Sequence, residues 1–101
     1  MKTKTPTIET LNVNEGSRGL RCSKEKYEVV RKAMLAVVPR KREGIAFHEL
    51  PKALLSRIPK NLFQTDGSVS WYVTTVKLDL EARGVIQRIA GSRPQRLRRL
   101  K

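Results

Sequence analysis

The residues best suited to chemistry in this chain are arginines near its C-terminus. Six basic residues and no acidic residue occupy the last fourteen positions, namely Arg88, Arg93, Arg96, Arg98, Arg99 and Lys101. Guanidinium groups bind phosphate oxygens in pairs, and arginines at a hairpin tip can enter a narrow minor groove. If about six phosphates were neutralised, duplex binding would weaken with salt at a log–log slope of roughly −5. A frayed basic terminus without a partner is the alternative.

The charge of the whole chain also indicates a polyanionic partner. Twenty-two Lys and Arg oppose nine Asp and Glu, which gives a net charge of +13. A field of this sign steers polyanions and releases their counterions. Nucleic acid is the favoured partner, and an anionic membrane surface, an acidic protein or a basic tail that only aids solubility are the alternatives. The loop Arg40-Lys41-Arg42 either approaches a phosphate backbone or is a solvated turn.

Catalytic residues are scarce. His48 is the only histidine, and Cys22, the only cysteine, has no histidine near it in sequence. Asp79 and Glu81 are two positions apart on a predicted helix, so they diverge, and Asp79 is better placed to pair with Arg83 at i,i+4. There is no phosphate-binding glycine loop and no metal-ligand spacing. We therefore expect no enzyme activity, no cofactor and no small-molecule ligand.

The sequence also bears on the compartment. A lone cysteine allows no intramolecular disulfide. The first nineteen residues contain no apolar core of the kind that export requires, and no run approaches the roughly 18 apolar residues of a membrane helix. These observations predict a cytoplasmic protein.

Several elements are needed to position the arginines. Residues 1–22 are polar and are expected to form an arm, with an extended piece around 7–13. Apolar spacing and caps then predict a helix over 24–38 after an N-cap at Ser23, a short strand at 45–46, a helix over 47–58, a helix over 68–83, and strands over 85–90 and 95–100 around a turn at 91–94. Pro39 and Pro59 end the first two helices, and Gly84 is a left-handed cap of the third.

This order of elements is typical of one architecture. Helix, short strand, helix, helix and hairpin form a winged helix, in which a three-helix bundle is followed by a C-terminal β-hairpin wing. We therefore predict an α+β fold that is mostly α. The expected division is a polar N-terminal arm over 1–22 and a winged-helix domain over 23–101.

The third predicted helix has three faces. Val69, Tyr72, Val73, Val76 and Leu80 form its core stripe. Its polar positions, together with its first residues, suit contacts with phosphates and base edges, and the candidates are Ser68, Ser70, Thr74 and Lys77. Ordinary solvated residues are the alternative for this face.

Trp71 and Leu78 lie seven positions apart on the side away from the core stripe. An exposed apolar pair of this kind indicates that another surface covers it. The N-terminal arm or the loop at Leu62-Phe63 could cover it, a homodimer could bury it, or a ligand could contact it. A dimer seam at this place would keep the third helix out of DNA.

Four segments resemble a family of small bacterial winged-helix-like proteins of unknown function. They are IETLNVNEG (8–16), KYEVVRKAML (26–35), PKNLF (59–63) and SWYVTTVKLDLEARGVI (70–86). The family's third helix has Trp, then Val, then LDLEA(K/R)G, which Trp71, Val76 and residues 78–84 match. The chain departs from the pattern with Tyr72 in place of a second Trp and Lys77 in place of Gln. The resemblance implies a fold but no assigned activity.

Together these observations predict non-enzymatic DNA binding by a winged helix, as a small transcriptional regulator or nucleoid accessory, in dimeric form. Residues from the third helix would meet the groove, and the wing arginines would hold the backbone. The main alternative is a protein-interaction or dimerisation module centred on Trp71 and Leu78, because a fold does not fix a function. Structured RNA is a third partner for the same basic wing.

Overall fold

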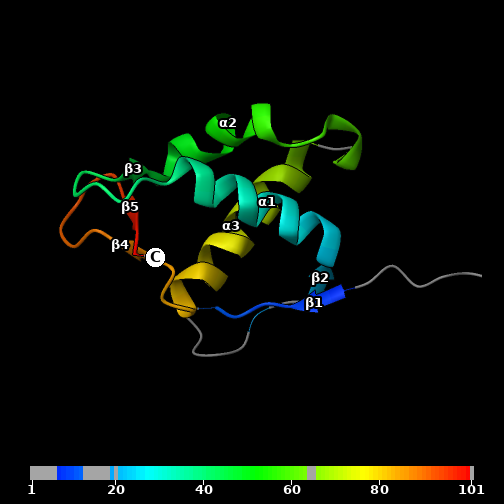
Figure 1. Cartoon of the computed structure of the whole chain (residues 1–101), viewed down its shortest axis with the longest axis horizontal. Coiled ribbons are helices and arrows are strands. Elements are labelled where there is room, and N and C mark those ends of the chain that lie inside the picture. The colour runs from blue at the N-terminus through cyan, green and yellow to red at the C-terminus, as the bar shows by residue number, and fades with distance from the viewer. Residues whose placement is uncertain (1–6, 13–18, 20, 64–65, 101) are drawn as a thin grey trace, which may run out of the picture.

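The computed structural model describes residues 7–12, 19, 21–63 and 66–100, and these parts form an α+β fold (Figure 1). The helices are α1 (Lys24–Val37), α2 (Leu50–Leu54) and α3 (Asp66–Ala82). One sheet joins β1 (Thr7–Glu9) to β2 (Arg21–Ser23), and the other joins β3 (Ile45–Ala46), β5 (Arg96–Arg99) and β4 (Ile86–Arg88). The predicted fold class, α+β, is confirmed.

The first helix follows its sequence signals closely. The Ser23 side chain accepts a hydrogen bond from the Lys26 N–H at 3.3 Å, which satisfies one of the unpaired donors of the first turn. Tyr27, Val30 and Met34 are buried on its inner face. Pro39, two residues after its end, cannot continue the helix. The prediction of a helix over 24–38 is thus confirmed to within one residue.

The second helix is not the single helix predicted over 47–58. A 3₁₀ turn at Phe47–Glu49, the five-residue α2 and another 3₁₀ turn at Leu55–Arg57 follow one another. The Phe47 N–H donates to the Gln95 carbonyl at 2.8 Å, so the segment is tied to the start of β5 before it becomes helical. Pro51 stands in the first turn of α2, as expected. Because α2 is so short, the helices do not form a regular three-helix bundle.

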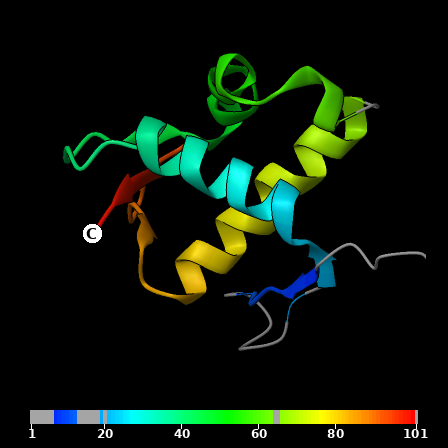
Figure 2. The ribbon, with the colours of Figure 1, turned by 45° about the vertical axis from the view of Figure 1, so that its right-hand side comes forward.

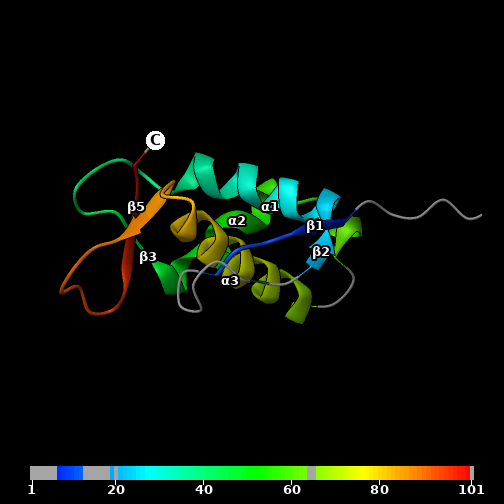
Figure 3. The ribbon, with the colours of Figure 1, turned by 90° about the horizontal axis from the view of Figure 1, so that it is seen from below.

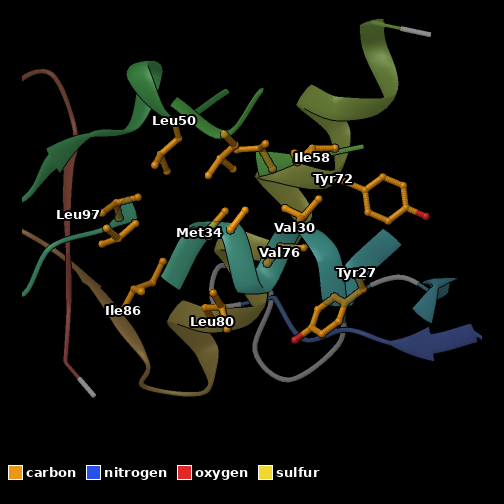
Figure 4. Close-up of a cluster of buried hydrophobic side chains, with 14 of the residues drawn as sticks. Tyr27, Val30, Met34, Leu50, Ile58, Tyr72, Val76, Leu80, Ile86 and Leu97 are labelled. Carbon is orange, nitrogen blue, oxygen red and sulfur yellow. The ribbon is translucent and has the colours of Figure 1, made fainter. Parts of the chain in front are cut away.

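The third helix crosses α1 and carries much of the core (Figures 2 and 4). Tyr72, Val73, Val76 and Leu80 are buried against α1 and α2, as the predicted stripe requires. Gly84 follows the helix with a φ of 73°, a left-handed conformation that L side chains rarely adopt. The chain then turns directly into β4.

The C-terminal hairpin forms as predicted and joins the short strand. In the order β3–β5–β4 all neighbours are antiparallel, with Leu97 opposite Arg88 on one side and Ile45 on the other. Leu97 and Ile86 are buried, so this face of the sheet closes the core beside α3 (Figure 4). The neighbouring β5 positions, Arg96 and Arg98, therefore face outward.

The N-terminal segment is also part of the fold. Thr7, Ile8 and Glu9 pair with Ser23, Cys22 and Arg21 in register. The following residues, 10–12, run along α3 (Figure 3), and the Leu11 N–H donates to the Asp79 side chain at 2.8 Å. The extended piece predicted around 7–13 is confirmed for 7–9, while Val13 lies outside the described residues.

Candidate nucleic-acid interface

The cations near α3 are held by two buried carboxylates. Asp79 is fully buried, and its oxygens accept hydrogen bonds from the Leu11 N–H at 2.8 Å, from the Tyr27 hydroxyl, and from Arg83 Nε at 3.0 and 2.9 Å. Burial, with the Asp79 carboxylate nearby, raises the pKa of Tyr27, so this hydroxyl stays a donor. The same carboxylate raises the pKa of Arg83. We call these groups the Asp79 cluster.

Glu81 forms a second cluster, two residues further along α3. Lys77 Nζ lies 2.6 Å from Glu81 Oε1, and Arg88 Nε donates to Glu81 Oε2 at 2.5 Å. The Lys77 and Glu81 side chains are each 5% exposed, and Lys77 Nζ lies 4.8 Å from the centre of the Phe47 ring. Burial lowers the pKa of Lys77, and Glu81 opposes this shift. We call this the Glu81 cluster.

The structure corrects the interpretation of Lys77. Its position on the polar face of the predicted helix made Lys77 a candidate nucleic-acid contact, but the side chain is buried, so this prediction of its orientation is wrong. Its ammonium group is enclosed by α3, Glu81 and Phe47. The Lys77 side chain packs against the Phe47 segment despite its helical-wheel position, because the long aliphatic stem of lysine can be buried when its charge is paired. Lys77 therefore presents no charge to a ligand.

The Trp71–Leu78 face is covered only in part. Residues 10–12 and Gly19 lie against Thr75 and Leu78 and enclose a small cavity of about 50 Å³ with them. Thr75 is buried and Leu78 half-buried, whereas Trp71 is 42% exposed and packs edge-to-face on Tyr72, with ring centres 4.9 Å apart. The arm thus covers Leu78, one of the alternatives considered, and the two residues do not form one exposed pair.

Among the nucleic-acid candidates on α3 whose side chains the structure describes, two are exposed. Ser70 and Thr74 are exposed in the N-terminal half of the helix, and both are uncharged. The side chain of Ser68 lies outside the described part of the structure. Both basic residues near the end of α3, Lys77 and Arg83, are paired with carboxylates. The outward side of α3 therefore offers hydroxyls but no unpaired cation among the described residues.

The arginines gather instead at one end of the molecule. The loop after α1 and the β4–β5 hairpin lie side by side there (Figures 1 and 3). The basic residues of this region, which we call the basic end, are Arg40, Lys41, Arg42, Arg93, Arg96, Arg98 and Arg99. Glu43 is the only acidic residue of the loop and hairpin. No ion pair found among the described residues involves any of these seven cations.

Hydrogen bonds hold the loop and the hairpin together. Arg96 Nε donates to the Glu43 carbonyl at 2.7 Å, and Arg96 Nη2 donates to the Gly44 carbonyl at 3.2 Å. Gly44 has a φ of 62°, and a Cβ there would lie 2.2 Å from the Leu97 carbonyl oxygen. The loop thus approaches β5 as closely as only glycine permits. Arg96 is consequently a structural link, and the Arg40–Arg42 loop shares a surface with the wing.

The hairpin arginines differ in what they can bind. Arg88 is paired with Glu81, and its side chain is 37% exposed. Arg93 is exposed at the tip, while Arg98 and Arg99 are half-buried. The structure therefore brings Arg93, Arg98 and Arg99 together with the loop at residues 40–42, and it directs Arg88 toward α3. Lys101 lies outside the described residues.

No helix among the described residues is long and apolar enough to span a bilayer. Within the same residues, no group of three or more His, Cys, Asp or Glu side chains could hold a metal ion.

The fold and this surface define a small basic α+β protein with a concentrated cationic end. The model of a family described as "Family of unknown function (DUF6958)" matches residues 7–97, and the chain therefore belongs to that family. The match includes β1 and residues 10–12, so the family's shared sequence begins within the predicted arm. Comparisons with curated proteins and with solved structures found no match.

Proposed function

We propose that this protein is a winged-helix DNA-binding protein that holds duplex DNA through its basic end. The observation that carries the proposal is the joining of two basic segments, residues 40–42 and the β4–β5 hairpin, by the Arg96 hydrogen bonds. Seven cations and one carboxylate on one surface make a strong, localised attraction for a phosphate backbone.

The topology supports the winged-helix assignment. The short β3 pairs with β5, and the hairpin follows α3 after a single glycine turn. The β4–β5 hairpin is then the wing, and the loop before β3 lies beside it. The short α2 departs from a regular bundle, and the proposal does not depend on its length.

The mode of binding follows from the placement of charge. Because Lys77 and Arg83 are paired with carboxylates, α3 has little to attract it into a major groove. The basic end offers phosphate contacts, which position a protein without reading sequence. We therefore expect weakly sequence-dependent binding, as in a nucleoid-type accessory protein rather than a site-specific regulator.

The test is a fluorescence anisotropy titration of labelled mixed-sequence duplex DNA at about 50 and about 200 mM salt. If about six phosphates are contacted, the log–log salt slope is roughly −5. Replacing two free arginines, R93A/R98A, should weaken binding at least about tenfold and reduce the slope by about 2. Arg96 is left intact because it holds the loop.

The control is K24A/K52A, which removes the same charge from two exposed lysines away from the basic end. It should lower the affinity less than threefold. An equal loss in both variants would remove the assignment to the basic end, and no binding at about 50 mM salt would end the proposal. Tighter binding of duplex RNA than of DNA would reassign the partner to RNA.

A further inference from the structure

A groove lies between α1 and the segment that follows α2, away from the basic end. Its volume is about 330 Å³, and it is lined by Val29, Lys32, Ala33, Ala36, Arg57 and Pro59. Figure 2 shows α2 and the following segment lying along α1. The groove is within the range of sites that take ligand groups, roughly 300 to 1,000 Å³.

The lining has two kinds of residues. The floor is apolar and made of small side chains, because Val29, Ala33 and Ala36 follow one another at i, i+4 and i+7 on α1 and Pro59 faces them. The two polar lining residues, Lys32 and Arg57, are both basic and exposed. Neither takes part in an ion pair found in the described regions.

We propose that this groove docks an acidic segment of a different protein, with an aliphatic side chain on the floor and carboxylates against Lys32 and Arg57. Charge complementarity selects this occupant. A second copy of the chain is disfavoured because each copy carries +13. A sugar–phosphate strand has no aliphatic group to fill the floor. The inference does not depend on DNA binding, since it concerns other residues.

The acidic segment would bind as an amphipathic helix or as an extended chain. Its apolar side chains would lie in the groove, and its acidic side chains would flank them. Because the groove is small and its two cations are exposed, the contact should be weak, with micromolar affinity rather than nanomolar. It would let an acidic partner bind while the basic end holds a polyanion.

The experiment uses two labelled peptides and the full chain. The first is a short amphipathic peptide of Leu and Glu, with Leu at i, i+3, i+4 and i+7, and the second has Lys in place of each Glu. Anisotropy should report binding of the Glu peptide, and the Lys peptide should bind at least about tenfold more weakly. NMR shift changes should centre on residues 29–36 and 57–59.

Three groove variants and one matched control locate the contact. K32A/R57A should weaken binding of the Glu peptide roughly tenfold. K32E/R57E should reverse the preference, so that the Lys peptide binds more tightly than the Glu peptide. R93A/R98A is the matched control, with the same charge removed from the basic end, and should change peptide affinity less than twofold. Ala36 is exposed, so A36W should fill the groove and abolish binding without unfolding, as thermal melts would verify.

Retention of Glu-peptide binding by K32A/R57A, or an equal loss in R93A/R98A, would overturn the proposal. So would shift changes confined to residues 40–44 and 93–99, or an absence of binding by the Glu peptide at millimolar concentration. These results leave the DNA titration unaffected, so the two proposals fail separately.

Discussion

The cations around α3 and those of the basic end are chemically alike but differ in their partners. Lys77, Arg83 and Arg88 are bound to two carboxylates of one helix, Asp79 and Glu81. The seven cations of the basic end form no ion pair among the described residues, and the hydrogen bonds found for the Arg96 guanidinium go to backbone carbonyls. Basic residues thus have two separate uses in this chain. Those near α3 hold its elements together, and those at the basic end, Arg96 apart, are the ones that we propose bind DNA.

Removing Asp79 should give the largest loss of stability among the tests of this difference between the two groups of cations. In D79A the Tyr27 hydroxyl and the Leu11 N–H lose their buried acceptor, and Arg83 loses its partner. We expect the free energy of unfolding to fall by about 3 kcal/mol, measured by urea denaturation. R83A should cost under about 1 kcal/mol, because this guanidinium is 41% exposed. If D79A and R83A lowered the free energy of unfolding equally, the ion pair of Asp79 with Arg83, and not the hydrogen bond from the arm to Asp79, would account for the stability of the cluster.

The next largest effect concerns Glu81. E81Q leaves the Lys77 ammonium buried without a counter-charge, which should cost about 2 kcal/mol at neutral pH. Urea denaturation measures it, and DNA affinity measured on the folded protein should change less than threefold. A large loss of affinity without a loss of stability would show that the cluster itself belongs to the interface.

Replacing Arg88 and Arg98, which lie on the same hairpin, compares the α3 clusters with the basic end directly. R98A should weaken duplex binding about fivefold and leave stability within about 0.5 kcal/mol, since none of the ion pairs found among the described residues involves Arg98. R88A should instead cost up to about 1 kcal/mol of stability and keep DNA affinity within twofold. Anisotropy and denaturation on both variants decide this, and a reversed pattern would contradict the division between the two regions.

The smallest effect is the pH dependence of stability due to Lys77. Its pKa is lowered in the folded state, so between that value and its ordinary value of 10.5 the unfolded chain binds more protons. The contribution of Lys77 therefore rises as pH increases through this window. The difference in stability between wild type and K77M should grow in favour of wild type as the pH is raised toward 10.5. A flat difference would show that Lys77 is solvated.

The local elements could be predicted from sequence because their signals are local. Ser23, Pro39 and Gly84 sit where caps and breakers act, and the predicted α1, hairpin and short strand are found there. The second helix was predicted as one piece and is broken. The hydrogen bond from the Phe47 N–H to the Gln95 carbonyl joins residues far apart in the sequence, so the residues around Phe47 do not predict it.

The site was less predictable, because it depends on which cations are paired. The i,i+4 pair of Asp79 and Arg83 was expected and is present. The arm's hydrogen bond to Asp79 and the burial of Lys77 were missed. One signal was available. Trp71 and Leu78 make α3 apolar on the side opposite its core stripe, and helices that are apolar all round are covered on both sides.

One turn of α3 binds a segment that precedes α1 and a strand that follows α3, since Asp79 accepts from Leu11 and Glu81 from Arg88. A shortened protein that began at the first helix would leave a buried carboxylate short of a donor and uncover Leu78. The unit that can be transplanted or excised intact therefore begins no later than β1.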